Sequence, residues 1–103
     1  MRCIIKVNIP IEAGNEAIRT GKLRKTIKSV IEELKPEAAY FTAERGQRSG
    51  IFVVDLKDPS QIPMVAEPFF LAFNASVEIP PAMTLEDLMK AGPHIEKAIK
   101  NYA

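Results

Sequence analysis

The sequence predicts one α+β domain, with the element order β-α-β-β-α-β and a further helix at the C-terminal end. Short runs in which apolar and polar residues alternate predict the strands, and most of these runs end at a proline or a polar turn. Between them, apolar residues recur every three or four positions, which is the helical period. The chain has 103 residues, 47% hydrophobic and 26% charged, which is typical of a single globular domain.

The first strand and the first helix lie near the N-terminus. Alternation over residues 3–9 predicts the strand, and Pro10 ends it because proline has no N–H to donate to a ladder. A short loop follows, and Asn15 is expected to cap a helix over residues 16–34. Gly21 weakens the first half of this helix, by roughly 1 kcal/mol relative to alanine. The apolar stripe of the helix consists of Leu23, Ile27, Val30, Ile31 and Leu34.

A β-hairpin is expected in the middle of the chain. Its strands are predicted at residues 38–43 and 50–56, and a polar turn at residues 44–49 joins them. Within the turn, Gly46 suits a positive φ. The two strands are therefore expected to be antiparallel neighbours in one sheet.

The third strand is the most informative segment, because both of its faces are mainly apolar. Ile51, Val53 and Asp55 alternate with Phe52, Val54 and Leu56. A strand with one face in water alternates apolar with polar residues, so this strand is expected to be covered on both sides. The chain's own helices can cover one face. We expect a second copy of the chain to cover the other, which predicts a homodimer formed through the sheet.

A second helix and a fourth strand follow the hairpin. The helix is expected to begin at Ser60, which caps it, and to run to about residue 70. Pro63 fits the first turn of a helix, and Pro68 is expected to shorten or kink the far end. The fourth strand is predicted at residues 75–79, where apolar residues again alternate with polar ones.

The last segment, residues 84–102, is predicted to be helical. Thr84 and Asp87 approximate a capping box, in which each side chain accepts a hydrogen bond from the other residue's backbone N–H. Gly92 and Pro93 are expected to break the segment into two short helices. With two crossovers and one hairpin before it, the whole chain predicts a ferredoxin-like β-α-β-β-α-β plait with a four-stranded antiparallel sheet and helices on one face.

Part of the chain resembles the dimeric α+β barrel superfamily, in particular its muconolactone-isomerase-like and antibiotic-monooxygenase-like members. Its layout is most similar to that of small uncharacterised members with an added C-terminal helix. The resemblance rests on residues 50–56, Asp58-Pro59-Ser60, Glu67-Pro68-Phe69-Phe70 and residues 76–80. It implies that two sheets pack face to face across a twofold axis and that a small-molecule cavity lies between sheet and helices. Members of the superfamily include isomerases, cofactor-free oxygenases and haem-degrading proteins.

The composition argues against several classes of protein. Fourteen Lys and Arg residues against thirteen Asp and Glu residues give a net charge of +1, too small for a strong nucleic-acid or membrane field. The segment Arg48-Ser49-Gly50-Ile51-Phe52 lacks the aromatic spacing of an RNA recognition motif. The single cysteine, Cys3, excludes an intrachain disulfide and fits a reducing compartment. No window approaches the ~18 apolar residues of a membrane helix, so a soluble cytoplasmic protein is expected.

The candidate site residues are Tyr40, Arg45, Arg48, Asn74 and His94. Arg45 and Arg48 flank the hairpin turn, where they could hold a carboxylate or phosphate in a bidentate way or simply form a solvated turn. Tyr40 and Asn74 could point into a cavity or meet water. His94 could act as a general base or be an ordinary surface histidine. A lone histidine without cysteines or paired carboxylates at ligand spacing predicts no metal site, and no cofactor is expected.

The first predicted helix also carries a cationic surface without intervening acids. The surface consists of Arg19, Lys22, Arg24, Lys25 and Lys28. It could meet an acidic partner or a phosphate backbone. Because the net charge is close to zero, we favour a solvated helix face that acids elsewhere in the chain balance.

Three functions follow as hypotheses. The first is binding of a small molecule in a cavity between sheet and helices. The alternative is a small cofactor-independent isomerase or monooxygenase-like enzyme, with Tyr40 or His94 as acid or base and Arg45 as an anion anchor. The third is a structural assembly subunit without a ligand, which a core without a cavity of roughly 300 Å³ or more would favour.

Overall fold

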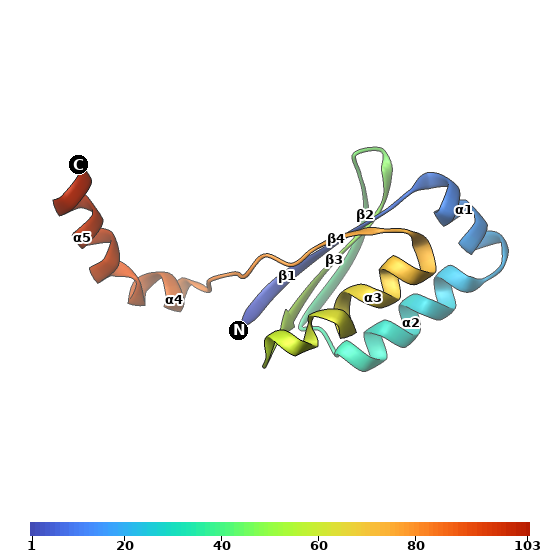
Figure 1. The fold of residues 1–103 in the computed structure, drawn as a ribbon, viewed down its shortest axis with the longest axis horizontal. Coiled ribbons are helices and arrows are strands. Elements are labelled where there is room, and N and C mark those ends of the chain that lie inside the picture. The colour runs from blue at the N-terminus through green and yellow to red at the C-terminus, as the bar shows by residue number, and fades with distance from the viewer.

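The computed structural model describes residues 1–103 and confirms the α+β class. Four antiparallel strands form one open sheet in the order β2-β3-β1-β4 (Figure 1). The strands are β1 (Arg2–Ile9), β2 (Ala38–Glu44), β3 (Gln47–Asp55) and β4 (Ser76–Glu78). This sheet order is compatible with a ferredoxin-like fold.

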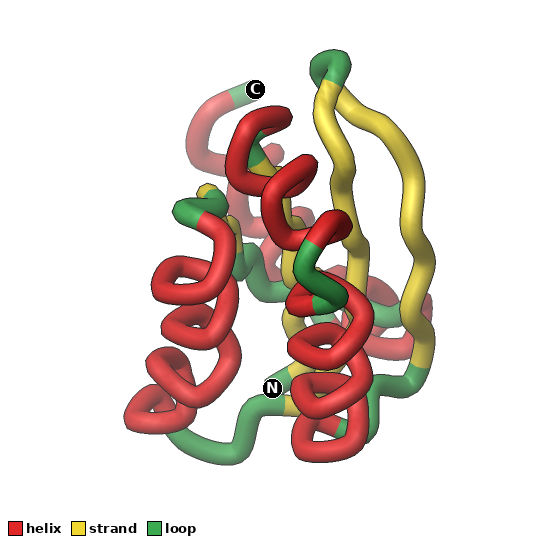
Figure 2. The backbone as a smooth tube through the Cα atoms, turned by 90° about the vertical axis from the view of Figure 1, so that its right-hand side faces the viewer, coloured by secondary structure: helices red, strands yellow, loops and turns green.

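Three helices form a layer on one face of the sheet, and two more stand away from it (Figure 1, Figure 2). The layer contains α1 (Ile11–Arg19), α2 (Lys22–Leu34), a short 3-10 turn η1 (Pro59–Gln61) and α3 (Ile62–Phe73). The separate pair consists of α4 (Leu85–Lys90) and α5 (Gly92–Tyr102), which we call the arm. The sheet therefore has an inner face, which the helices cover, and an open face.

The single helix predicted between the first two strands is in fact two helices, and the first begins earlier than expected. α1 starts directly after Pro10, whose carbonyl accepts a hydrogen bond from the backbone N–H of Gly14 at 2.9 Å. Asn15 therefore lies inside α1, and the predictions of a loop and of an Asn15 cap were wrong. Gly21 adopts a φ of 79° at the start of α2, a left-handed conformation that separates the two helices. The buried residues of α1 are Gly14 and Ala17, too small to be recognised as an apolar stripe.

The second helical region also departs from the prediction at both ends. Asp58, and not Ser60, is the cap: its side chain accepts from the backbone N–H of Ser60, and Gln61 completes a capping box. Pro68 lies inside α3, which continues beyond it for more than a turn. Asn74 then ends the helix in a left-handed conformation with φ 52°.

The strands are close to their predicted positions. β3 begins three residues earlier than predicted, because only Arg45 and Gly46 form the turn, both with positive φ. A two-residue turn of this kind matches the twist of the flanking strands. β4 is shorter than its predicted range. In the arm, the predicted capping box of Thr84 and Asp87 is confirmed, as is the division into two short helices.

The core lies between the inner face and the helix layer. Phe52 of β3 is 1% exposed and stacks on Phe69 of α3, with ring centroids 5.8 Å apart. The rings of Phe41 of β2 and Phe52 are arranged edge to face, with centroids 5.7 Å apart. Ile5 of β1 pairs with Phe52 across the ladder and is fully buried. Burial of each such side chain contributes about 2 kcal/mol, so this cluster holds the helices on the sheet.

One face of β3 is covered by the helices, as predicted, whereas cover of the other face by a second copy stays a prediction. Phe52 and Val54 are buried on the inner face, whereas Ile51 and Val53 are half-buried on the open face. Ile51 lies between Lys6 of β1 and Tyr40 of β2 in the register. No other element of this chain covers the open face (Figure 1).

Two adjacent phenylalanines of α3 offer a test of this core. Phe69 is 1% exposed and Phe70 is 41% exposed. We expect Phe69→Ala to lower the free energy of unfolding by about 3–5 kcal/mol, because it removes a buried ring and leaves a cavity. Phe70→Ala, the matched control, is expected to cost less than about 1.5 kcal/mol. Urea unfolding measures both values, and equal losses would contradict the packing described here.

Candidate functional site

A groove of about 780 Å³ lies between the β2–β3 hairpin and the α1–α2 pair. We call it the hairpin groove. It exists because the helix layer stops short of β2, which stands to one side of the helices in Figure 2. All residues of β2 from Tyr40 to Glu44 are exposed, including Phe41 on the inner face, whose exposed fraction is 55%. An aromatic side chain of the inner face is thus left without cover at this margin.

Aromatic rings form the floor of the hairpin groove, and aliphatic side chains form one wall. Phe41, Phe52 and Phe69 all line it, and Phe52 makes ring contacts with both of the others. Gly50 lies among them, and a Cβ added there would be only 3.1 Å from atoms of the Phe52 ring. The glycine therefore allows this ring to lie against the backbone of β3. The wall includes Ile18, Leu23 and Ile27.

Three cations line the same groove. Arg24 and Lys28 come from α2, where residues four apart share one face of the helix. Arg48 comes from β3 and is partly buried. None of the three makes an ion pair within 4 Å, and no acidic residue lines the groove.

The side chain of Arg48 lies against the backbone of α1. A Cβ added to Gly14 would be 2.9 Å from Nη1 of Arg48 and 3.3 Å from Cγ2 of Ile9. The absence of a side chain at position 14 therefore makes room for the guanidinium. Arg48 and Gly14 form one local unit, in which a buried helix glycine positions a cation at the edge of the groove.

The structure distributes the five predicted site residues over several places. Only Arg48 lines the hairpin groove. Tyr40 lies on the open face with 67% of its surface exposed. Arg45 is in the hairpin turn and borders a much smaller hollow of about 60 Å³. Asn74 ends α3, and His94 is exposed on α5. Neither residue lines the hairpin groove or the smaller hollow. Tyr40 and His94 therefore share no site.

Sequence reasoning did not assign Arg24, Lys28 and Phe41 to a site. The two cations belong to a helix surface that we interpreted as solvated, and their i,i+4 spacing is a signal that could have separated them from their neighbours. Phe41 follows Tyr40 directly in β2, so the two side chains lie on opposite sides of the sheet. What the sequence alone did not indicate is that β2 extends beyond the helix layer.

The open face has an apolar centre and polar ends. Ile4, Ile51 and Val53 occupy the centre and are all half-buried. At one end, Asn8 donates a hydrogen bond from Nδ2 to Oγ of Ser49 at 2.9 Å. The apolar patch is therefore limited to the centre of the open face, and polar side chains lie at the ends.

The other end of the open face is charged. Arg2 pairs with Glu37 at 3.0 Å, and Lys57 pairs with Asp55 at 2.6 Å. The hydrogen bond from Lys57, together with one from the amino group of Met1, lowers the pKa of Asp55 to about 2. These acids are engaged at the sheet end, away from the hairpin groove.

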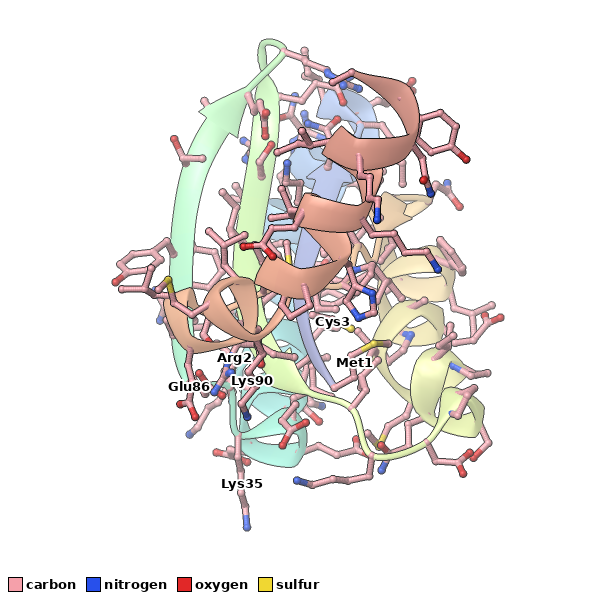
Figure 3. The ribbon with its side chains drawn as sticks, turned by 90° about the vertical axis from the view of Figure 1, so that its left-hand side faces the viewer. Met1, Arg2, Cys3, Lys35, Glu86 and Lys90 are labelled. Atoms are coloured by element: carbon pink, nitrogen blue, oxygen red, sulfur yellow. The ribbon has the colours of Figure 1, made fainter.

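The arm makes little contact with the rest of the molecule. After β4 the chain follows β1, where the backbone N–H of Ala82 donates to the carbonyl of Arg2 at 2.9 Å, and then leaves the sheet (Figure 1). Glu86 and Lys90 of α4, labelled in Figure 3, pair with each other at 3.6 Å. The apolar side chains of the arm are exposed: Leu85, Leu88, Met89, Ile95, Ile99 and Tyr102.

The chain has neither a cluster of metal-ligating side chains nor a membrane-spanning helix. No three His, Cys, Asp or Glu side chains are grouped so that they could hold a metal ion. None of the helices has the length and apolar character required to cross a membrane. Comparison with protein-family models and with curated proteins found no match to this chain.

The contact between Gly14 and Arg48 leads to a prediction. Gly14→Ala is expected to displace the Arg48 guanidinium, because its Nη1 would otherwise lie 2.9 Å from the new methyl group. The gain in helix propensity, up to about 1 kcal/mol, offsets this displacement, so the free energy of unfolding is expected to change by less than about 1 kcal/mol. A crystal structure and urea unfolding measure the two effects.

Gly92→Ala in α5 is the control, because nothing lies within 4 Å of a Cβ at that position. It is expected to leave Arg48 in place. A Gly14→Ala protein in which the guanidinium does not move, but which loses more than about 2 kcal/mol, would show that Gly14 serves backbone packing and not Arg48.

Proposed function

We propose that this protein binds a small molecule in the hairpin groove. The observation that carries the proposal is the groove itself, with its volume of about 780 Å³ and its aromatic floor. Ligand pockets are typically about 300–1,000 Å³, mostly apolar, with a few polar groups that orient the ligand. Nine of the sixteen lining residues are hydrophobic, and three of the others are the cations described above. A ligand on this floor would cover Phe41, which the chain leaves exposed.

Binding is favoured over catalysis because no acid–base pair lines the groove. Its ionisable side chains are two arginines and a lysine, and no carboxylate, imidazole, thiol or phenol lines it. Tyr40 and His94, the residues considered for acid–base chemistry, lie on the open face and on the arm. The proposal therefore assigns a binding or sensing role to the groove.

We also infer that the fold is a ferredoxin-like plait and that two copies pair through their open faces. The sheet order and the chain resemblance to the dimeric α+β barrel superfamily support this inference. The apolar centre around Ile4, Ile51 and Val53 supplies a surface that a second copy would cover. Such a dimer would leave both hairpin grooves accessible, because they lie on the inner faces.

Two adjacent residues of β2 provide a test of binding in the hairpin groove. Phe41 lines the groove, whereas Tyr40 faces the other side of the sheet. We expect uncharged phenylnaphthylamine to bind and to gain fluorescence. Phe41→Ala should weaken its affinity about fivefold or more, because an aromatic contact is lost. Tyr40→Ala should change the affinity by less than about twofold. Fluorescence titration measures these affinities, and a Phe41→Ala protein that binds the probe as tightly as the unsubstituted one would refute the proposal.

The proposed dimer has its own test. Multi-angle light scattering after gel filtration is expected to give twice the mass of one chain at micromolar concentration. Ile51→Lys places a charge in the centre of the open face and is expected to shift the protein to a monomer. Leu71→Lys, on an α3 side chain that is 79% exposed, should leave the dimer unchanged. A monomeric unsubstituted protein, or a dimer that tolerates Ile51→Lys, would argue against pairing through this face.

A further inference from the structure

We propose that the ligand of the hairpin groove is an amphipathic anion. Its apolar body would lie on the rings of Phe41 and Phe52, and its carboxylate or phosphate headgroup would be held by the cations of α2 and β3. This inference rests on the proposed function and adds the chemical class of the ligand.

Charge is concentrated at the groove in a way that the composition does not explain. The whole chain has nearly equal numbers of basic and acidic residues, fourteen and thirteen. Among the sixteen residues that line the groove there are three bases and no acid. This excess of positive charge attracts an anion but adds no affinity for an uncharged molecule. The local charge therefore indicates the sign of the ligand.

The three cations are also free to bind an external anion. The acids that form ion pairs in this chain are Glu16, Glu37, Asp55 and Glu86, and their partners lie outside the groove. Arg24, Lys28 and Arg48 have no protein carboxylate within 4 Å. A ligand headgroup would thus gain charge-assisted hydrogen bonds without first breaking an ion pair of the protein.

Arg48 is the most buried of the three cations. It is partly buried, and its Nη1 lies beside Gly14 of α1, whereas Arg24 and Lys28 are exposed on α2. A side chain that packs against its neighbours loses less conformational freedom on binding than an exposed one. Arg48 is therefore expected to contribute most to headgroup binding, with the two α2 cations in support.

A pair of fluorescent probes tests the proposal, because they share one body and differ in charge. Anilinonaphthalene sulfonate is an anion, and phenylnaphthylamine is its uncharged counterpart. We expect the anion to bind the unsubstituted protein about tenfold more tightly. Raising the salt concentration from about 0.05 to about 0.5 M should weaken binding of the anion and leave the uncharged probe unaffected.

Substitutions locate the charge effect. Arg48→Gln is expected to weaken binding of the anionic probe about fivefold to tenfold, and Arg24→Gln or Lys28→Gln about threefold each. The uncharged probe should change by less than about twofold in all three. Lys25→Gln, on the same helix but outside the groove, removes the same charge and should affect neither probe. Circular dichroism of each variant verifies that it is folded.

The headgroup is identified by displacement of the bound anionic probe. Decanoate and decyl phosphate have the same chain with different anionic heads, and decanol has that chain without a charge. Displacement by either anion at concentrations where decanol has no effect supports the proposal. The anion that displaces the probe at the lower concentration indicates which headgroup the groove prefers. Displacement by decanol at the same concentrations would contradict it.

The remaining outcomes separate this inference from the proposed function. Equal affinity for the two probes would overturn the anionic ligand while leaving binding in the hairpin groove intact. Failure of both probes to bind would overturn both proposals. A several-fold higher affinity for the anionic probe in Leu88→Lys would show that the arm of a second copy occupies the groove. That result would also overturn the small-molecule ligand.

Discussion

Burial of one face of the sheet, and of that face alone, is the constraint on which the rest of this structure depends. β1 and β3 direct Ile5, Phe52 and Val54 toward the helices, and the ring of Phe52 joins the hairpin to α3. All helices that pack on the sheet lie on this side, while α4 and α5 stand apart (Figure 1). This arrangement leaves two surfaces uncovered. One is the hairpin groove, where the helix layer ends, and the other is the open face of the sheet.

The extent of the helix layer is set by small residues. Gly14 and Ala17 are the buried residues of α1, so this helix lies against the sheet without large side chains between them. Gly21 then separates α1 from α2 with a positive φ that other residues rarely adopt. Gly14 also leaves room for the Arg48 side chain at the edge of the layer, and Phe41 is exposed beyond it. The packing of α1 on the sheet thus contributes both to the core and to the edge of the hairpin groove.

The sequence predicted the parts of this structure that depend on local periodicity. Local residue patterns located all four strands, and the capping box of Thr84 and Asp87 was recognised from spacing alone. The prediction failed for the start of α1, where residues 11–14 were expected to form a loop and Asn15 a cap, although all of them lie inside the helix. It also failed to single out Arg24 and Lys28, because their role depends on the distance from α2 to a strand far away in the sequence. Local patterns do not encode that distance.

Strand alternation also keeps the two proposed surfaces independent. Phe41 and Tyr40 are neighbours in β2, yet one lines the hairpin groove and the other lies on the open face, because successive side chains of a strand point to opposite sides. The same holds in β3 for Phe52 and Ile51. A ligand in the groove and a second copy on the open face would therefore contact different residues of the same two strands. The two surfaces share the backbone of the hairpin, on whose inner face the rings of Phe41 and Phe52 pack against each other.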